Sequence, residues 1–226
     1  SAVNLVGLLS TGNVHASLDH LLALITMAEQ QKVTVKLHLF SDGKDDSPFS
    51  LQKILTKLPL EKLATLIGRH YAMDREENWS LTQKTYEALL GAGGHLVENS
   101  GELDTIIQNH YERGSNEEFL PPLRFGENAI ADGESILFFN YREDSIRQIS
   151  EAFVLKDFDK FPLRRLNNMH IVTMTHYEDR FSVPVAYPAE TVEQPLGKLI
   201  SESGRTQLRV AETYKYAHVT YFFNGY

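Results

Sequence analysis

The sequence predicts an α/β fold, built on a largely parallel sheet flanked by helices. Short β-rich apolar runs alternate with segments in which apolar residues recur at helical spacing, along most of the 226 residues. Hydrophobic residues make up 42% of the chain, which is enough to bury a sizeable core. The predicted strands are 3–9, 33–40, 63–68, 135–141 and 169–175.

Helices are predicted between these strands. The first covers 18–31, with Ser17 as its N-cap residue. The others cover 51–57, 81–90, 103–112, 145–155 and 196–203. The glycines in 91–94 follow a helix and not a strand, so they predict a helix stop rather than a phosphate-binding loop. Ser100 has neither a nucleophile elbow nor an adjacent base, and we interpret it as a helix cap.

The organisation changes near residue 188. Three prolines fall between 184 and 195, where a strand-like piece gives way to a new helix, and this pattern predicts a hinge. We therefore expect one lobe at 1–188, and a hinge with part of a further segment at 189–226. The tail 207–226 is predicted to be rich in strand.

The overall charge restricts the class of partner. A formal charge of −8 repels phosphate backbones and anionic membranes, so neither nucleic acid nor a membrane is an expected partner. The chain has no cysteine, which excludes a disulfide, a thiolate nucleophile and Cys-ligated zinc, and fits a cytoplasmic protein. No apolar run approaches the roughly 18 residues of a membrane span, and the N-terminus lacks the basic start of a signal peptide.

Charged residues follow four of the predicted strands. Ligands of an open α/β sheet are usually held by loops at the carboxyl ends of the strands. Arginine suits such a site because its planar fork pairs bidentately with carboxylate or phosphate. In chain order these residues are His15, then Lys44 and Asp45, then Arg69 and Arg75, then Arg142, Asp144 and Arg147. Together they predict a pocket for a small anion that carries hydroxyl groups.

Each of these residues also has a purely structural interpretation. His15 by itself is typical of a loop or cap, and the Asp-Gly in "SDGKDD" favours a turn whatever the function. Arg69 and Arg75 lie beside acidic residues and could form surface ion pairs worth under about 1 kcal/mol. Asp19 and His20 are adjacent within a helical pattern, so they point in different directions and do not predict a metal site. Only the convergence of all four loops favours a site.

Five stretches resemble a known family in their order and spacing. They are "GLLSTGNVHASLDHL", "FSDGKDDSP", "GRHYAMDREENW", "FFNYREDSIRQ" and "QLRVAETYKYAHVTYFFNG". They resemble the central part of cofactor-independent (2,3-bisphosphoglycerate-independent) phosphoglycerate mutase. The resemblance implies a two-lobe glycolytic and gluconeogenic isomerase that interconverts 3-phosphoglycerate and 2-phosphoglycerate through a phosphoserine. The complete enzyme is expected to be monomeric.

The resemblance also implies how the work is divided between the lobes. One lobe, similar to alkaline phosphatases, holds two manganese ions and the serine that takes the phosphoryl group. The other lobe holds the glycerate while it reorients. Residues 1–188 resemble this substrate-orienting (phosphotransferase) lobe, and 189–226 resemble the hinge and a partial segment of the alkaline-phosphatase-like lobe.

Carried over by motif, most of the charged residues match substrate-binding positions of the family. Asp45 is the candidate to orient or deprotonate a glycerate hydroxyl, and is the one catalytic residue expected here. Lys215, in "ETYKYAHVT", matches a lysine that the phosphatase lobe contributes near the phosphoryl group. The full expected substrate-binding set is His15, Lys44, Asp45, Arg69, Arg75, Arg142 and Lys215.

Two positions depart from the family pattern. Lys44 replaces the arginine of the D-G-R-D pattern, which keeps the charge but loses the fork. Ser145 replaces the second arginine of R-x-D-R. The loss of one bidentate contact to an anion weakens binding by about 1.5–3 kcal/mol unless another cation, such as Arg147, substitutes.

The motifs of phosphoryl transfer are missing from this sequence. It contains no N-S-E-x-G-H, no D-H-G-N and no Asp and His cluster with the family's metal-ligand pattern, so no metal ligand is expected. We expect a fragment of a larger enzyme that is inactive alone. The alternative is a non-catalytic small-anion-binding module whose ligand has changed, and a purely structural domain is disfavoured by the four charged loops.

Overall fold

The computed structural model describes residues 2–188 and 192–225. The chain divides into two compact units, Ser1–Tyr187 and Pro188–Tyr226. The first unit is built on a seven-stranded sheet with the order β4-β5-β3-β2-β1-β6-β7. All neighbouring strands are parallel except β3 and β5, which pair antiparallel. The predicted α/β fold with a largely parallel sheet is therefore confirmed.

The chain reverses its direction of travel across the sheet at β1 (Ala2–Leu9). From β1 it moves outward to β2 (Thr34–Ser41) and β3 (Leu63–Gly68), and it later crosses to β6 (Ser135–Phe138) and β7 (His170–Thr173) on the other side of β1. Such a switch point leaves a crevice at the carboxyl ends of the strands, where an α/β sheet holds its ligands.

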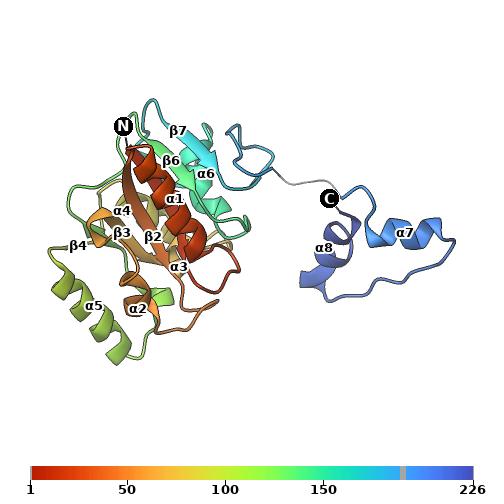
Figure 1. Cartoon of the computed structure of the whole chain (residues 1–226), viewed down its shortest axis with the longest axis horizontal. Helices are drawn as coiled ribbons and strands as arrows, with labels where there is room; N and C mark the ends of the chain where they lie inside the picture. Colours follow the sequence, from red (N-terminus) through yellow and green to blue (C-terminus); the bar gives the residue numbers. More distant parts are fainter. Residues whose placement is uncertain (1, 189–191, 226) are drawn as a thin grey trace. The chain divides into compact units, whose positions relative to one another are not determined.

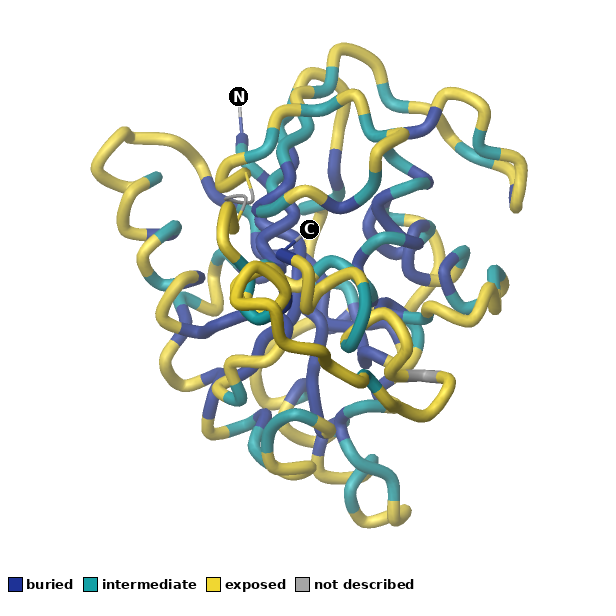
Figure 2. The backbone as a smooth tube through the Cα atoms, turned by 90° about the vertical axis from the view of Figure 1, so that its right-hand side faces the viewer, coloured by how far each residue is buried: buried dark blue, intermediate teal, exposed yellow. Residues whose placement is uncertain are grey.

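Helices cover both faces of the sheet. In Figure 1, α1 (Leu18–Gln30) lies on the viewer's side of the strands and α4 (Trp79–Leu89) lies behind them. The helix α6 (Arg147–Val154) packs against α4. Because both faces are covered, β1, β2 and β3 are almost continuously buried, and in Figure 2 the centre of this unit is dark blue while the surrounding loops are yellow and teal.

The five predicted strands are confirmed as β1, β2, β3, β6 and β7. The strand β3 has the predicted bounds, whereas β6 ends three residues earlier than the predicted residue 141. Two further strands, β4 (His95–Val97) and β5 (Leu123–Phe125), were not predicted. Each has only three residues and directly follows a Gly-Gly or Pro-Pro pair, so the sequence pattern around them indicates a turn.

The predicted helices are present as α1, α2 (Leu51–Leu55), α4, α5 (Ser100–Glu112), α6 and α7 (Leu196–Glu202). The single-turn α3 (Arg69–Ala72) was not predicted. Ser17 occupies the N-cap position of α1, but its side chain makes no capping hydrogen bond. The interpretation of Ser100 as a cap was wrong, because Asn99 accepts the capping bond from the Glu102 amide and Ser100 is already helical. The predicted stop after α4 is confirmed, with Gly91 at φ 79°.

The second unit contains α7, η3 (Thr213–Lys215), α8 (Tyr216–Val219) and η4 (Phe222–Asn224). The prediction of a strand-rich tail was wrong, since residues 207–225 contain no strand. A strand needs a partner to pair with, and β-rich sequence alone does not supply one. Leu208 is 88% exposed, which shows how little of this apolar segment the unit buries. In the part of the chain that the structure describes, no helix is long and apolar enough to cross a membrane.

The end of β3 is packed too closely to accept a larger residue than glycine. A Cβ built on Gly68 would lie 2.6 Å from the Leu120 amide nitrogen and closer still to the Glu118 carbonyl. Both contacts are with backbone, which cannot rotate away. We predict that Gly68→Ala lowers the free energy of unfolding by about 1–3 kcal/mol, measured by urea denaturation. The matched control is Gly101→Ala in α5, where the nearest atom lies 3.3 Å away and the change stays under about 1 kcal/mol. Equal stability of the two variants would contradict the close packing.

Candidate functional site

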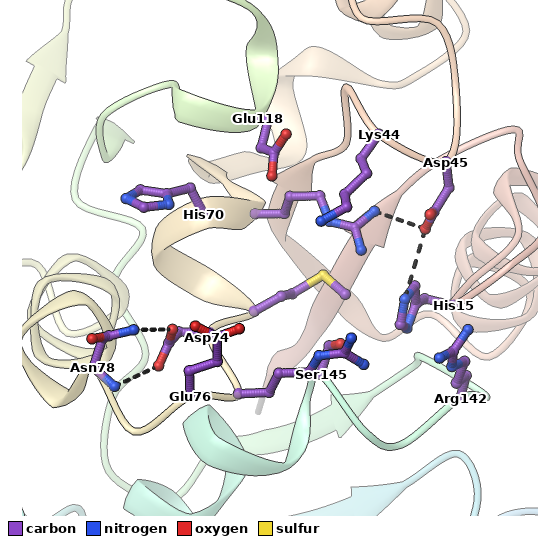
Figure 3. Close-up of a pocket in the computed structure, with 13 residues that line it drawn as sticks. His15, Lys44, Asp45, His70, Asp74, Glu76, Asn78, Glu118, Arg142 and Ser145 are labelled. Carbon is purple, nitrogen blue, oxygen red and sulfur yellow. Dashed lines mark hydrogen bonds and ion pairs between the residues drawn. The ribbon is translucent and has the colours of Figure 1, made fainter. Parts of the chain in front are cut away.

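The loops after four parallel strands bring most of the predicted site residues into one cavity of about 360 Å³ (Figure 3). His15 follows β1, Lys44 and Asp45 follow β2, and Arg142 follows β6. Arg69 is the first residue of α3, directly after β3. The complete lining is His15, Lys44, Asp45, Arg69, His70, Met73, Asp74, Arg75, Glu76, Asn78, Glu118, Arg142 and Ser145.

A buried carboxylate joins the ends of three neighbouring strands. Asp42, directly after β2, has a side chain that is 1% exposed. Its Oδ1 accepts a hydrogen bond from Arg69 Nη1 at 2.6 Å, and its Oδ2 accepts one from the Ser10 hydroxyl at 2.5 Å. The same Oδ1 accepts the backbone amides of Lys44 and Asp45, which shapes the turn that carries them. The sequence interpretation missed Asp42 because Asp-Gly was explained by the turn alone, although its place at a strand end was a usable signal.

Arg69 connects Asp42 to the candidate catalytic residue. Its Nη1 also lies 2.7 Å from Asp45 Oδ2, and the arginine is buried. Burial works against the charge and lowers the pKa of Arg69, but the hydrogen bonds that Arg69 donates to Asp45 and Asp42 outweigh it, so the net pKa shift is upward. Arg69 is therefore a permanent cation whose position is fixed by two carboxylates.

His15 is a buried imidazole that lies between two carboxylates of the site. Its Nε2 lies 3.8 Å from Asp45 Oδ2, and its Nδ1 lies 3.4 Å from Asp144 Oδ1. Among the described residues, Nδ1 makes no hydrogen bond, either with Asp144 or with another group. Burial lowers the pKa of His15 and the charge of Arg69 lowers it further, against the opposing effect of Asp144. A neutral histidine beside Asp45 can exchange a hydrogen bond or a proton with a hydroxyl group held in the cavity.

Asp144 pairs with the two more exposed arginines. Its Oδ2 accepts from Arg75 Nη1 at 2.6 Å and from Arg142 Nη2 at 2.7 Å. The two arginine side chains are 56% and 43% exposed, so both retain donors that face solvent. Burial raises the pKa of Asp144, but the hydrogen bond from Arg142 and the nearby charges outweigh it and lower the pKa overall. The Asp144 carboxylate therefore accepts from guanidinium N–H groups to which a ligand anion would also bind.

The two family departures lie at the cavity, whereas Arg147 does not. Lys44 projects into the cavity in Figure 3, and the buried Ser145 lines it. Arg147 is directed elsewhere, because its Nε donates to the Tyr177 carbonyl at 2.8 Å. Arg147 thus does not take the place of the arginine missing at 145.

Some lining residues were not predicted, and one predicted residue lies outside this unit. Glu118 comes from η2 (Glu117–Phe119), which no strand-end argument places near β3. His70 and Asp74 were not among the predicted site residues, yet both line the cavity. Lys215 belongs to η3 of the second unit, so the geometry of the first unit does not test its role.

The described residues do not fit the metal pair that the resemblance implies. Within 2–188 and 192–225, no group of three or more histidine, aspartate or glutamate side chains is arranged to hold a metal ion. The acids nearest His15 are Asp45 and Asp144, and both are paired with arginines. We therefore derive no step through a metal from these residues.

Fold and site together define an α/β protein with an arginine-rich crevice at a sheet switch point. A family model described as "BPG-independent PGAM N-terminus" matches residues 1–179. The chain belongs to the 2,3-bisphosphoglycerate-independent phosphoglycerate mutase family, as its sequence motifs indicated.

Individual relatives agree with this family. The 2,3-bisphosphoglycerate-independent phosphoglycerate mutase of Antithamnion sp. is 40% identical over 233 residues, covering 100% of this chain and 45% of the relative. That of Synechococcus sp. (strain JA-3-3Ab) is 39% identical over 227 residues, covering 97% and 42%. A crystal structure of Leishmania mexicana phosphoglycerate mutase at low cobalt concentration matches with a TM-score of 0.77 and 26% identity, covering 100% and 45%. The chain spans a little under half the length of these relatives.

The environment of His15 generates a prediction about pH. We predict that His15 titrates below its ordinary pKa of about 6.5, because burial and Arg69 disfavour the imidazolium. Asp144→Asn should lower the pKa further, since the Asp144 carboxylate acts in the opposite direction. NMR titration of the His15 ring measures both values, with Asp104→Asn on the exposed surface of α5 as the control. A pKa at or above 6.5 in the unsubstituted chain would contradict this environment.

The lowered pKa of His15 also determines how the free energy of unfolding changes with pH. A lowered pKa in the folded state means that the unfolded chain binds the proton more readily. The contribution of neutral His15 is therefore fully present above about pH 6.5, and is lost as the pH falls toward the folded-state pKa. His15→Gln should remove that part of the pH dependence.

Proposed function

We propose that this chain is the substrate-orienting part of a 2,3-bisphosphoglycerate-independent phosphoglycerate mutase, an isomerase that interconverts 3-phosphoglycerate and 2-phosphoglycerate through a phosphoserine. One observation carries the proposal: His15, Asp45 and three arginines from four strand ends line one cavity in a chain of this family. The names of its relatives support the same activity.

The chemistry of the cavity fits the parts of a phosphoglycerate. Arg75 and Arg142 have partly exposed guanidinium groups that suit the anionic groups of a phosphoglycerate. When the ligand binds, it replaces Asp144 as the acceptor of some of the hydrogen bonds that these arginines donate. Arg69 stays fixed by its carboxylates. Asp45, 3.8 Å from His15, is proposed to orient or deprotonate the glycerate hydroxyl that next receives the phosphoryl group.

The remaining functions are assigned to parts of the complete enzyme beyond this cavity. We propose that 1–188 is the phosphotransferase lobe, and that 189–226, with Lys215, begins the alkaline-phosphatase-like lobe. The two manganese ions and the nucleophilic serine belong to that lobe. The complete enzyme is proposed to be a cytoplasmic monomer that acts on 3-phosphoglycerate, 2-phosphoglycerate and glycerate, and this chain alone is expected to show no turnover in an enolase-coupled assay.

Binding of 3-phosphoglycerate tests the proposal directly. We expect weak binding, because half of a two-lobe cleft desolvates the ligand incompletely. Amide NMR shifts should map to the loops after β1, β2, β3 and β6, and Arg142→Ala should weaken binding about tenfold or more, a loss of at least about 1.4 kcal/mol. Arg113→Ala, at the end of α5, is the matched control.

Two outcomes would contradict this function. Shifts confined to the second unit or to α5 would place the ligand outside the proposed site. Tighter binding of an unphosphorylated hydroxy acid than of 3-phosphoglycerate would favour the alternative, a non-catalytic small-anion-binding module, which the departures at Lys44 and Ser145 support.

The buried Ser145 offers a gain-of-function test. An arginine there would reach into the cavity beside Arg142 and add a charge-assisted contact to the anion. We predict that Ser145→Arg binds 3-phosphoglycerate several-fold more tightly, about 1 kcal/mol, measured by calorimetry. Circular dichroism confirms folding, and Ser115→Arg, in the loop between α5 and η2, controls for added charge. Unchanged affinity in a folded variant would mean that the site uses other cations or another ligand.

A further inference from the structure

We propose that Gln148 is a positioning residue that holds the Arg75 loop in place for anion binding. Gln148 lies in the first turn of α6, is buried, and is not among the residues that line the cavity. Its side-chain amide bridges two elements that come from a distant part of the sequence. The inference rests on the proposed function, because it concerns how the same cavity holds its ligand.

All the hydrogen bonds of the Gln148 side chain go to the loop between α3 and α4 or to α4 itself. Its Nε2 donates to Asp74 Oδ2 at 2.8 Å and to Thr82 Oγ1 at 2.6 Å. Its Oε1 accepts from the Glu77 amide at 3.2 Å. A glutamine amide suits this place because it has two donors and an acceptor at one end. No carboxylate or aliphatic side chain offers the same set.

The bonds of Gln148 reach a loop that is already shaped around Asp74. The Asp74 carboxylate accepts the backbone amide of Asn78 at 2.7 Å and the Asn78 side-chain amide at 2.9 Å. Figure 3 shows these two bonds at the edge of the cavity. Glu77 has a φ of 60°, a left-handed conformation that is uncommon for a residue other than glycine. The Gln148 bond to the Glu77 amide is one of the contacts that hold it.

Arg75 lies inside this held loop and depends on it for its direction. Its side chain is 56% exposed and contacts Asp144 by one hydrogen bond, so little packing fixes the guanidinium itself. Asp144 and Arg142 lie in the loop between β6 and α6, and Gln148 lies at the start of α6, directly after that loop. Gln148 therefore ties the backbone that carries Arg75 to the segment that carries Arg142. The separation of the two backbone segments that carry these guanidinium groups is set before a ligand arrives, which lowers the entropy lost on binding.

The test removes the amide while keeping its bulk. We expect Gln148→Leu to bind 3-phosphoglycerate about tenfold more weakly by calorimetry, because the Arg75 loop is no longer preorganised. Gln83→Leu, on α4, is the matched control, since its amide bonds only Glu87 along the same helix. In an Arg75→Ala background, Gln148→Leu should cause almost no further loss, because the two substitutions remove the same interaction. A merely structural role would instead weaken binding equally in both backgrounds.

A second measurement needs no ligand. Amide hydrogen exchange at residues 75–78 should become faster in Gln148→Leu, while exchange in β1 and β2 stays unchanged. If that variant fails to fold, Thr82→Val removes one acceptor of the Gln148 amide at nearly the same volume, and should move both results in the same direction by a smaller amount. Failure of the unsubstituted chain to bind 3-phosphoglycerate contradicts the proposed function. Full additivity with Arg75→Ala, or unchanged exchange at 75–78, overturns the role of Gln148 even when the chain binds.

Discussion

The buried ion pair between Asp42 and Arg69 is the interaction on which the site depends. It joins the segment after β2 to the segment after β3, and the Ser10 bond to the same carboxylate adds the end of β1. A buried pair of this kind contributes little net stability, but removal of one partner leaves the other charge uncompensated, at a cost of about 3–5 kcal/mol. Its effect is geometric: with Arg69 fixed, Asp45 is held 2.7 Å from a permanent cation, within 3.8 Å of His15.

The cavity gathers positive charge on a chain whose net charge is negative. The chain carries a formal charge of −8, so a free anion is repelled at long range and meets attraction only locally. Four cations line the cavity, and Asp45 and Asp144 hold three of them, all arginines, in defined positions. The fourth is Lys44, whose ammonium pairs with no side chain among residues 2–188 and 192–225. An incoming anion must compete with Asp144 for Arg75 and Arg142.

Sequence reasoning recovered the parts of this structure that follow from general rules. The carboxyl ends of parallel strands meet at one edge of a sheet, so His15, Asp45, Arg69 and Arg142 could be assigned to one site before any geometry was known. The departures at Lys44 and Ser145 were found by comparison with a motif. Asp42 and Gln148 were not found, because each has an ordinary local explanation as a turn residue or a helix residue, and their partners lie far away in the sequence. The strand-rich tail was mispredicted because strand propensity depends on a neighbouring strand.

The antiparallel pairing of β5 with β3 brings a short connecting segment to the carboxyl end of β3. Because β5 runs antiparallel to β3, the residues just before β5 arrive at the ligand end of β3, where Gly68 donates to the Leu120 carbonyl at 2.7 Å. One wall of the cavity, including Glu118, is therefore a short connecting segment, held by backbone bonds and by the side chains of Asn116 and Glu117. The Glu118 side chain lines the cavity from η2 and belongs to no strand. A substitution at 118 therefore changes the chemistry of this wall without replacing a residue of the sheet.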